Sequence, residues 1–257
     1  MKKFYIGYYN RIDLQNAIKK AVRIPNIILL VFAVLLVIVP ILFKDRIFKN
    51  NSDMSNVVLL RTLNGTGSAI FVGSGSYLLT AAHVVDGMNV SDYCHIEFQN
   101  PNNTNEKVYA RAELLYKGNW QPNTFTSANC LADYALMNIT LIDPHRISKP
   151  CQIVKNLASV KVANTISVEG YPNGVYSKTA GTVNNVDGGV LQDKNFFIVS
   201  AGAWGGNSGG ALLDANGNLL GIVTMTGTIP GISAGQTIAL KIDYIRKELA
   251  KHGFVIQ

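Results

Sequence analysis

The stretch Gly205–Gly210 (GGNSGG) places one serine, Ser208, among glycines. A serine hydroxyl is a poor nucleophile, so it acts only beside a base and where the oxyanion formed by its attack is stabilised. Glycine at Gly206 allows a sharp backbone turn, so that the N–H groups of Gly206 and Ser208 can point to one spot. A glycine-rich hairpin turn is the alternative reading. The choice depends on whether the chain also supplies a base and an acid.

Four histidines could be that base: His83, His95, His145 and His252. His83 differs from the others because it follows an apolar run that ends in two alanines, Ala81 and Ala82. Small residues there leave room for an imidazole to be held in one orientation. The other three lie in an alternating strand, in a turn and in a charged terminal segment. A structural role is the alternative for His83.

Asp133 is the best acid, because it opens the apolar run Asp133–Leu136. A carboxylate that leads into a buried strand is costly unless it is hydrogen-bonded. A histidine N–H would be a suitable partner, and the histidine would thereby be fixed in one tautomer. Asp86, Asp92 and Asp143 lie in polar loops or turns, where water can solvate them. Taken alone, Asp133 would also suit a turn or the start of a strand.

From Val57 onward, short apolar runs alternate with Gly, Ser and Asn turns, which predicts an all-β protein of barrel or sandwich type. We expect strands at 57–63, 67–73, 76–82, 94–99, 107–118, 133–141, 165–172, 175–186, 195–203, 211–225 (with a hairpin turn at 215–218) and 236–242. One helix over 243–253, capped by Asp243, would close the chain. Almost no other helix is expected. Whether the loops at 86–93, 118–129 and 227–235 gate a cleft is left open.

The segment 24–43 is uncharged and almost wholly apolar, and about 20 such residues can cross a bilayer as a helix. A cleaved signal peptide is the alternative. The long preceding arm and the charged residues at 44–46, where a cleavage motif would lie, favour an uncleaved anchor.

Charge predicts the orientation of this anchor. Residues 1–23 carry six basic residues and one acid, whereas 44–257 carry 17 basic and 15 acidic residues. The positive-inside rule therefore puts a basic arm (1–23) in the cytoplasm. A tether (44–56) and the folded domain (57–257) would lie in the periplasm or another extracytoplasmic space. The high pI is thus a topology signal, and no nucleic-acid partner is expected.

Three cysteines, Cys94, Cys130 and Cys151, make an odd number and match no metal-binding spacing. One pair could form a disulfide in an oxidising compartment, or all three could be unpaired and partly buried. Neither a metal nor a cofactor is expected.

Three motifs, TAAHVV (80–85), DYAL (133–136) and GNSGGAL (206–212), occur in the order His, Asp, Ser. In them the chain resembles the trypsin-like serine proteases of the chymotrypsin fold, most of all the HtrA/Deg branch. The resemblance, over roughly 57–245, implies two six-stranded barrels with the active site between them. It implies His83 as general base, Asp133 as its orienting acid and Ser208 as nucleophile. The N–H groups of Gly206 and Ser208 would form the oxyanion hole.

Departures from the family refine this expectation. Val84 and Trp204 stand where digestive relatives have cysteines, and neutral Asn207 replaces their aspartate, so activation by N-terminal cleavage is not expected. No PDZ domain is expected, because the 49 residues after Ser208 are needed for the second barrel. The primary substrate pocket is assigned to Gly202, Ala203, Thr224, Met225 and Thr226. Their small or uncharged side chains predict a preference for small or apolar substrate residues.

The resulting hypothesis is a membrane-anchored serine endopeptidase that acts on proteins or peptides outside the cytoplasmic membrane. A catalytically silent module that uses the same barrels to dock a partner is the alternative. An α/β-hydrolase esterase is disfavoured, because its histidine follows its serine and its strands alternate with helices. The natural substrate, a homo-oligomeric state and the regulatory trigger are left open.

Overall fold

The computed structural model describes residues 56–73, 75–100, 103–140, 150–226 and 233–256. The predicted arm (1–23), membrane span (24–43) and all but the last residue of the tether (44–56) lie outside these ranges. Their assignments therefore stay predictions. Within the described ranges, no helix combines the length and the apolar character needed to cross a membrane.

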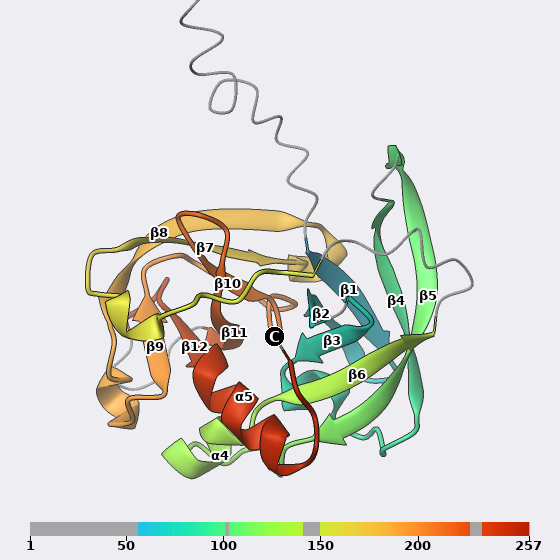
Figure 1. Ribbon diagram of the computed structural model, residues 1–257, viewed down its shortest axis with the longest axis horizontal. Coiled ribbons are helices and arrows are strands. Elements are labelled where there is room, and N and C mark those ends of the chain that lie inside the picture. The colour runs from blue at the N-terminus through green and yellow to red at the C-terminus, as the bar shows by residue number, and fades with distance from the viewer. Residues whose placement is uncertain (1–55, 74, 101–102, 141–149, 227–232, 257) are drawn as a thin grey trace, which may run out of the picture. The chain divides into compact units, whose positions relative to one another are not determined.

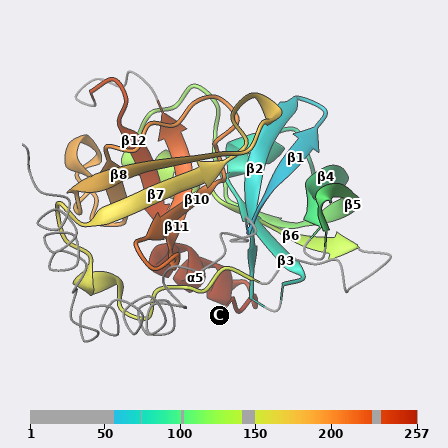
Figure 2. The same ribbon diagram turned by 90° about the horizontal axis from the view of Figure 1, so that it is seen from above.

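Two closed β-barrels of six strands each lie side by side (Figure 1, Figure 2). In the first barrel the strands neighbour one another in the order β1-β2-β3-β6-β5-β4, and all pairs are antiparallel. Its strands are β1 (Val57–Thr62), β2 (Gly65–Val72), β3 (Tyr77–Thr80), β4 (Tyr93–Asn100), β5 (Asn103–Lys117) and β6 (Ala135–Thr140). Strand β4 ends one residue later than predicted, at Asn100, and β5 begins four residues earlier, at Asn103.

The second barrel has the order β10-β11-β12-β9-β8-β7, again with antiparallel pairs throughout. Its strands are β7 (Thr165–Gly170), β8 (Ser177–Asn185), β9 (Phe196–Val199), β10 (Ala211–Asp214), β11 (Leu219–Thr226) and β12 (Thr237–Lys241). The two closed barrels confirm the predicted all-β, chymotrypsin-like fold.

Helices are short and lie between or after the strands. They are η1 (Ala82–Val85), α4 (Ser127–Leu131), η3 (Leu157–Ser159), η4 (Pro172–Gly174), η5 (Gly189–Leu191) and α5 (Ile242–Lys251). The sequence did not predict α4, which occupies part of the expected loop 118–129. The prediction that Asp243 caps α5 is wrong: Lys241 holds the cap position without a side-chain bond, and Asp243 lies in the first turn. Burial of Ile242, Ile245 and Leu249 anchors this helix.

Strand β1 shows how the two barrels share a core. Alternate side chains of a strand point to opposite faces. Val58 and Leu60 pack inside the first barrel, whereas Val57 and Leu59 pack in a cluster that also contains residues of β9–β12 and α5. All four are at most 1% exposed. Both faces of β1 are thus buried, which explains its uninterrupted apolar run. The shared cluster holds the two barrels together.

Cys94, Cys130 and Cys151 are all buried and unpaired. The structure thus agrees with the unpaired alternative and shows no disulfide among the described residues. Burial raises the pKa of each thiol, to about 11 for Cys94 and Cys130 and about 12 for Cys151. Since thiolates are the reactive form, these cysteines are not competing nucleophiles near neutral pH.

Candidate active site

His83 lies in the short helix η1, directly after β3, and its imidazole is partly exposed. The helix begins after Ala81, and both Ala81 and Ala82 are completely buried. Small side chains at these positions let the backbone turn tightly against the barrel. The His83 ring therefore extends from a rigid part of the first barrel.

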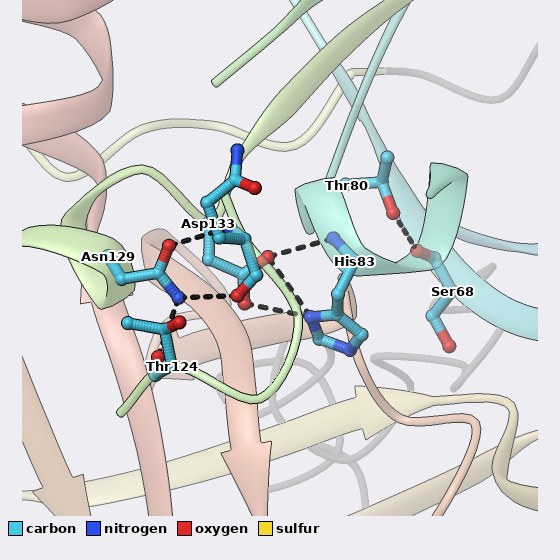
Figure 3. Close-up of polar contacts among 7 residues, drawn as sticks. Ser68, Thr80, His83, Thr124, Asn129 and Asp133 are labelled. Carbon is cyan, nitrogen blue, oxygen red and sulfur yellow. Dashed lines mark hydrogen bonds and ion pairs between the residues drawn. The ribbon is translucent and has the colours of Figure 1, made fainter. Parts of the chain in front are cut away.

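The Asp133 carboxylate makes three contacts with His83, two with its imidazole and one with its backbone N–H (Figure 3). The imidazole Nδ1 lies 3.0 Å from Oδ1 and 2.8 Å from Oδ2, and the His83 backbone N–H donates to Oδ1 at 3.0 Å. Because a carboxylate only accepts hydrogen bonds, Nδ1 carries the proton and Nε2 keeps its lone pair. Asp133 is only 1% exposed, so this pairing compensates a costly burial.

The position of Asp133 differs slightly from the sequence expectation. Strand β6 begins at Ala135, so Asp133 lies in the turn after α4 and not at the start of the strand. Its N–H donates to the Cys130 carbonyl at 3.2 Å. The carboxylate is thus placed by the end of α4, the helix that the sequence did not reveal.

Ser208 lies in the loop before β10, and glycines shape this loop for different reasons. Gly206 has a φ of +99°, and a side-chain Cβ there would lie 2.6 Å from the Tyr171 carbonyl oxygen. Gly209 has a φ of +79°, and its Cβ would lie 2.2 Å from the Ser68 carbonyl oxygen. Both positions therefore require glycine. The predicted sharp turn and close approach are present.

Hydrogen bonds fix the carbonyls of this loop and leave two N–H groups free. Gly205 C=O accepts from Asn173 N–H at 3.0 Å, and Asn207 C=O accepts from Gly210 N–H at 2.8 Å. In a trans peptide the next N–H points the opposite way. Those N–H groups belong to Gly206 and Ser208, and neither finds an acceptor among the described residues. They are available to stabilise an anion.

A cavity of about 480 Å³ lies between the barrels and brings the predicted residues together. His83 and Asp133 line it from the first barrel, and Ser208, Thr224 and Met225 line it from the second. No hydrogen bond joins Ser208 to His83 in the described structure; such contacts commonly tighten only when substrate binds. The Thr224 hydroxyl is buried and has no partner among the described residues.

The remaining pocket residues from the sequence are placed differently. Gly202 and Ala203 do not line this cavity. The Gly202 carbonyl accepts from the Thr179 hydroxyl at 2.8 Å, and Ala203 packs against the core of the second barrel. The side chain of Thr226 lies outside the described part of the chain. The structure therefore brings two of the five predicted pocket residues, Thr224 and Met225, to the cavity.

One wall of the cavity is formed by the loop 118–126, part of the segment 118–129 that the sequence left open as a possible gate; the lining role of its aromatic residues was not predicted. Trp120 lies beside the catalytic candidate His83, with ring centroids 5.7 Å apart, and Phe125 is 48% exposed in the same cavity. The Asn129 amide holds this loop. It donates to the carbonyl of Thr124 at 2.7 Å (Figure 3) and to that of Gln121 at 2.9 Å, and it accepts from Gln121 N–H at 2.7 Å. Two aromatic residues in a polar loop were the only sequence signal.

Comparisons with known proteins agree with this geometry. The family model of the trypsin-like peptidase domain matches residues 67–222. The Rv3671c protease of M. tuberculosis H37Rv, solved in an inactive form, is 22% identical with a TM-score of 0.58, over 84% of this chain and 96% of that one. The serine endoprotease from Yersinia pestis is 24% identical with a TM-score of 0.57, over 77% of this chain and 62% of that one. The HtrA-type protease AlgW, solved with a tripeptide, is 24% identical with a TM-score of 0.54, over 77% and 60%.

The chain spans less than two thirds of the length of the latter two proteins. No curated protein sequence matches it significantly. Since the family model covers more than half of the chain, the chain belongs to the trypsin-like peptidase family and is a serine endopeptidase. The structural neighbours, HtrA-type proteases among them, share its fold.

Proposed function

We propose that His83, Asp133 and Ser208 form the catalytic triad of a membrane-anchored endopeptidase. The observation that carries this proposal is the contact between Asp133 and His83 Nδ1, which leaves Nε2 as a base in the cavity that Ser208 also lines. A buried carboxylate that holds a histidine in this tautomer is the arrangement that general-base activation of a serine requires.

In the acylation step, the Ser208 hydroxyl oxygen attacks the carbonyl carbon of the scissile peptide, and its proton moves to His83 Nε2. The carbonyl π bond opens, and its electron pair resides on the oxygen. The tetrahedral intermediate then collapses: the C–N bond breaks, and the leaving nitrogen takes the proton from Nε2. Asp133 stays ionised and stabilises the imidazolium while it exists.

The oxyanion is assigned to the free N–H groups of Gly206 and Ser208. Donors that already point to the developing charge need no reorganisation during the reaction, and removing one such donor typically costs about 10²–10³ in kcat. Deacylation follows the same steps, with a water molecule as the nucleophile. His83 takes a proton from the attacking water, the ester bond to Ser208 breaks, and the serine oxygen recovers the proton.

The cavity supports substrates with uncharged side chains near the scissile bond. Asp133 is the only acidic residue among the described residues that line it, and His83 occupies its oxygens. No lysine or arginine lines it in that part of the chain. Apolar contacts come from Trp120, Phe125 and Met225. A peptide-library profile led by small or apolar residues is expected, and one led by Lys or Arg would contradict this assignment.

The anchor and its orientation rest on sequence. The apolar segment 24–43, together with the basic arm before it, supports a single-pass protein with its protease domain outside the cytoplasmic membrane. The test uses sealed inside-out vesicles, in which the cytoplasmic face of the membrane points outward. A protease added outside these vesicles should remove the arm and spare the domain. Digestion of the domain in intact vesicles would reverse the assigned topology.

Cleavage of unfolded casein by the full-length protein tests the enzymatic part of the proposal. The wild type should produce fragments, and Ser208→Ala, purified in parallel and equally folded, should produce none. A folded wild type that cleaves neither casein nor a peptide library would instead support a binding module. Equal cleavage by Ser208→Ala would show that a contaminating protease or another residue is responsible.

A further inference from the structure

Ser68 lies on β2 of the first barrel, yet it contacts the Ser208 loop of the second barrel through both backbone and side chain. Its N–H donates to the Ser208 carbonyl at 2.8 Å. Its hydroxyl donates to the Gly206 carbonyl at 2.7 Å. The residue is 0% exposed, so neither bond competes with water. One residue of the first barrel thus holds two carbonyls of the loop.

The same hydroxyl oxygen accepts a third bond, from the Tyr171 N–H at 2.8 Å. Tyr171 begins the segment whose Asn173 N–H holds the Gly205 carbonyl. Ser68 therefore ties the loop directly at Gly206 and also fixes the neighbouring segment that ties it at Gly205. Ser68 is itself held, because the Thr80 hydroxyl donates to its carbonyl at 2.7 Å (Figure 3). Thr80 ends β3, three residues before His83.

The need for such a tie follows from the glycines. Gly206 has no Cβ and can adopt many backbone conformations, so its own preference does not hold the peptide in one orientation. Asn207, between Gly206 and Ser208, is 1% exposed, and its backbone bonds stay within the segment 204–210. Its side-chain Oδ1 accepts no hydrogen bond within the described structure and therefore does not tie the loop to the rest of the protein. Hydrogen bonds from outside the loop must then define where the Gly206 N–H points.

We propose that Ser68 is a positioning residue, whose hydroxyl keeps the oxyanion hole formed by Gly206 and Ser208 in its anion-binding geometry. This inference rests on the proposed catalytic function. Ser68 touches no reacting atom. The Gly206 carbonyl belongs to the peptide between Gly206 and Asn207, which links the two peptides that carry the oxyanion N–H groups. Without the Ser68 hydroxyl, this carbonyl and the Tyr171 N–H lose their partner in a buried site, and only the bond from Asn207 N–H to the Trp204 carbonyl still holds the linking peptide. The two neighbouring peptides can then turn their N–H groups away from the oxyanion position.

The test compares wild type, Ser68→Ala and Ser68→Cys in the full-length protein, with Thr237→Val as the matched control. The Thr237 hydroxyl is also fully buried and donates to a backbone carbonyl, that of Ala201, at 2.7 Å, but outside the 205–210 loop. Ser68→Ala should lower kcat on a peptide substrate by about tenfold to hundredfold with little change in KM. Ser68→Cys, a weaker donor, should show a smaller loss, and Thr237→Val should show none of comparable size.

Two inhibitors of the same peptide sequence separate positioning from general damage. A peptide aldehyde forms an adduct with Ser208 whose oxygen occupies the oxyanion hole, whereas the peptide amide binds without one. Ser68→Ala should weaken binding of the aldehyde by the same factor as kcat falls, and it should leave the affinity for the amide unchanged. Equal loss for both inhibitors, or wild-type kcat in folded Ser68→Ala, would overturn the proposal. If Ser68→Ala does not fold, Ser68→Cys is judged by the same two ratios.

A measurement without turnover lets the two proposals fail separately. The backbone amide resonances of Gly206 and Ser208 report the loop geometry directly in isotope-labelled protein. They should shift in Ser68→Ala and Ser68→Cys but stay in place in Thr237→Val. Unchanged resonances in both Ser68 variants would refute positioning even if the wild type proved inactive. An inactive wild type with shifted resonances in the variants would refute only the catalytic proposal.

Discussion

Replacing Asp133 by Asn should nearly abolish turnover while leaving the fold intact. The amide oxygen can still accept the His83 backbone N–H, which now donates at 3.0 Å, so the loop keeps its anchor. The amide NH2, however, would take the place of Oδ2, which lies 2.8 Å from Nδ1. An NH2 group only donates, so Nδ1 must become an acceptor and the ring proton must move to Nε2. A protonated Nε2 cannot take the proton of Ser208.

The expected loss is about 10⁴-fold in kcat, or roughly 5 kcal/mol in the activation free energy. It is measured as the initial rate of hydrolysis of a fluorogenic peptide, with thermal unfolding recorded for each variant. Asp214→Asn is the matched control. Asp214 also accepts backbone N–H bonds, from Asn216 and Asn218 at 2.8 Å each, but in the distant β10–β11 hairpin. If folded Asp133→Asn kept a tenth of the wild-type kcat, the tautomer argument would be refuted.

Three further predictions concern the loops and the barrel. Gly209→Ala should disrupt the active-site loop, because its Cβ would lie 2.2 Å from both the Ser68 carbonyl and the Thr80 hydroxyl. Gly217 has a similar φ of +82° but open space around it, so Gly217→Ala should lower the free energy of unfolding, measured by chemical denaturation, by only about 1 kcal/mol. Equal losses in Gly209→Ala and Gly217→Ala would show that the close contacts at Gly209 do not matter. Asn129→Asp loses the two donors that hold the 118–126 loop, so KM should rise several-fold and Trp120 fluorescence should shift to the red. An unchanged KM would show that the loop does not contact substrate. For Glu97, burial opposes ionisation, but hydrogen bonds from Lys107 and Arg61 outweigh it and lower its pKa. Its contribution to stability is therefore present above the unfolded-state pKa and lost as pH falls through the folded value. Glu97→Gln should flatten the acid limb of the unfolding curve, and an acid limb as steep as that of the wild type would show that Glu97 contributes nothing.

The barrels could be predicted from the sequence because strands that are buried on one or both faces need apolar runs, such as Val57–Leu60. Turn residues then separate the runs, and the predicted strands differ from the observed ones by only a few residues at most ends. Helix α4 could not be predicted, since Ser127–Leu131 is one turn long and shows no helical period. The cap of α5 was mispredicted because residue type alone does not say where the chain leaves β12.

The three residues of the proposed triad could be proposed from the sequence because each adjoins an apolar run and because their three motifs, in the order His, Asp, Ser, resemble those of trypsin-like proteases. The residues that hold the loops around the active site could not. Ser68 looks like one more small residue in a strand, and its partners Gly206 and Tyr171 are more than 100 positions away in the sequence. Asn129 lies in a segment predicted to be a loop, and its role depends on three bonds to the backbone. The bonds of Ser68 join distant parts of the sequence, and those of Asn129 depend on how the loop folds back onto α4, so neither leaves a local pattern.

Covalent labelling by a fluorophosphonate tests the central claim most directly. The reagent reacts with a serine only when a base activates it and an oxyanion hole stabilises the developing charge. Intact-mass measurement of the full-length protein should show one adduct, and peptide mapping should place it on Ser208. Ser208→Ala and Asp133→Asn should both remain unlabelled on the same time scale. A folded wild type without an adduct, or an adduct on another residue, would contradict the proposed active site.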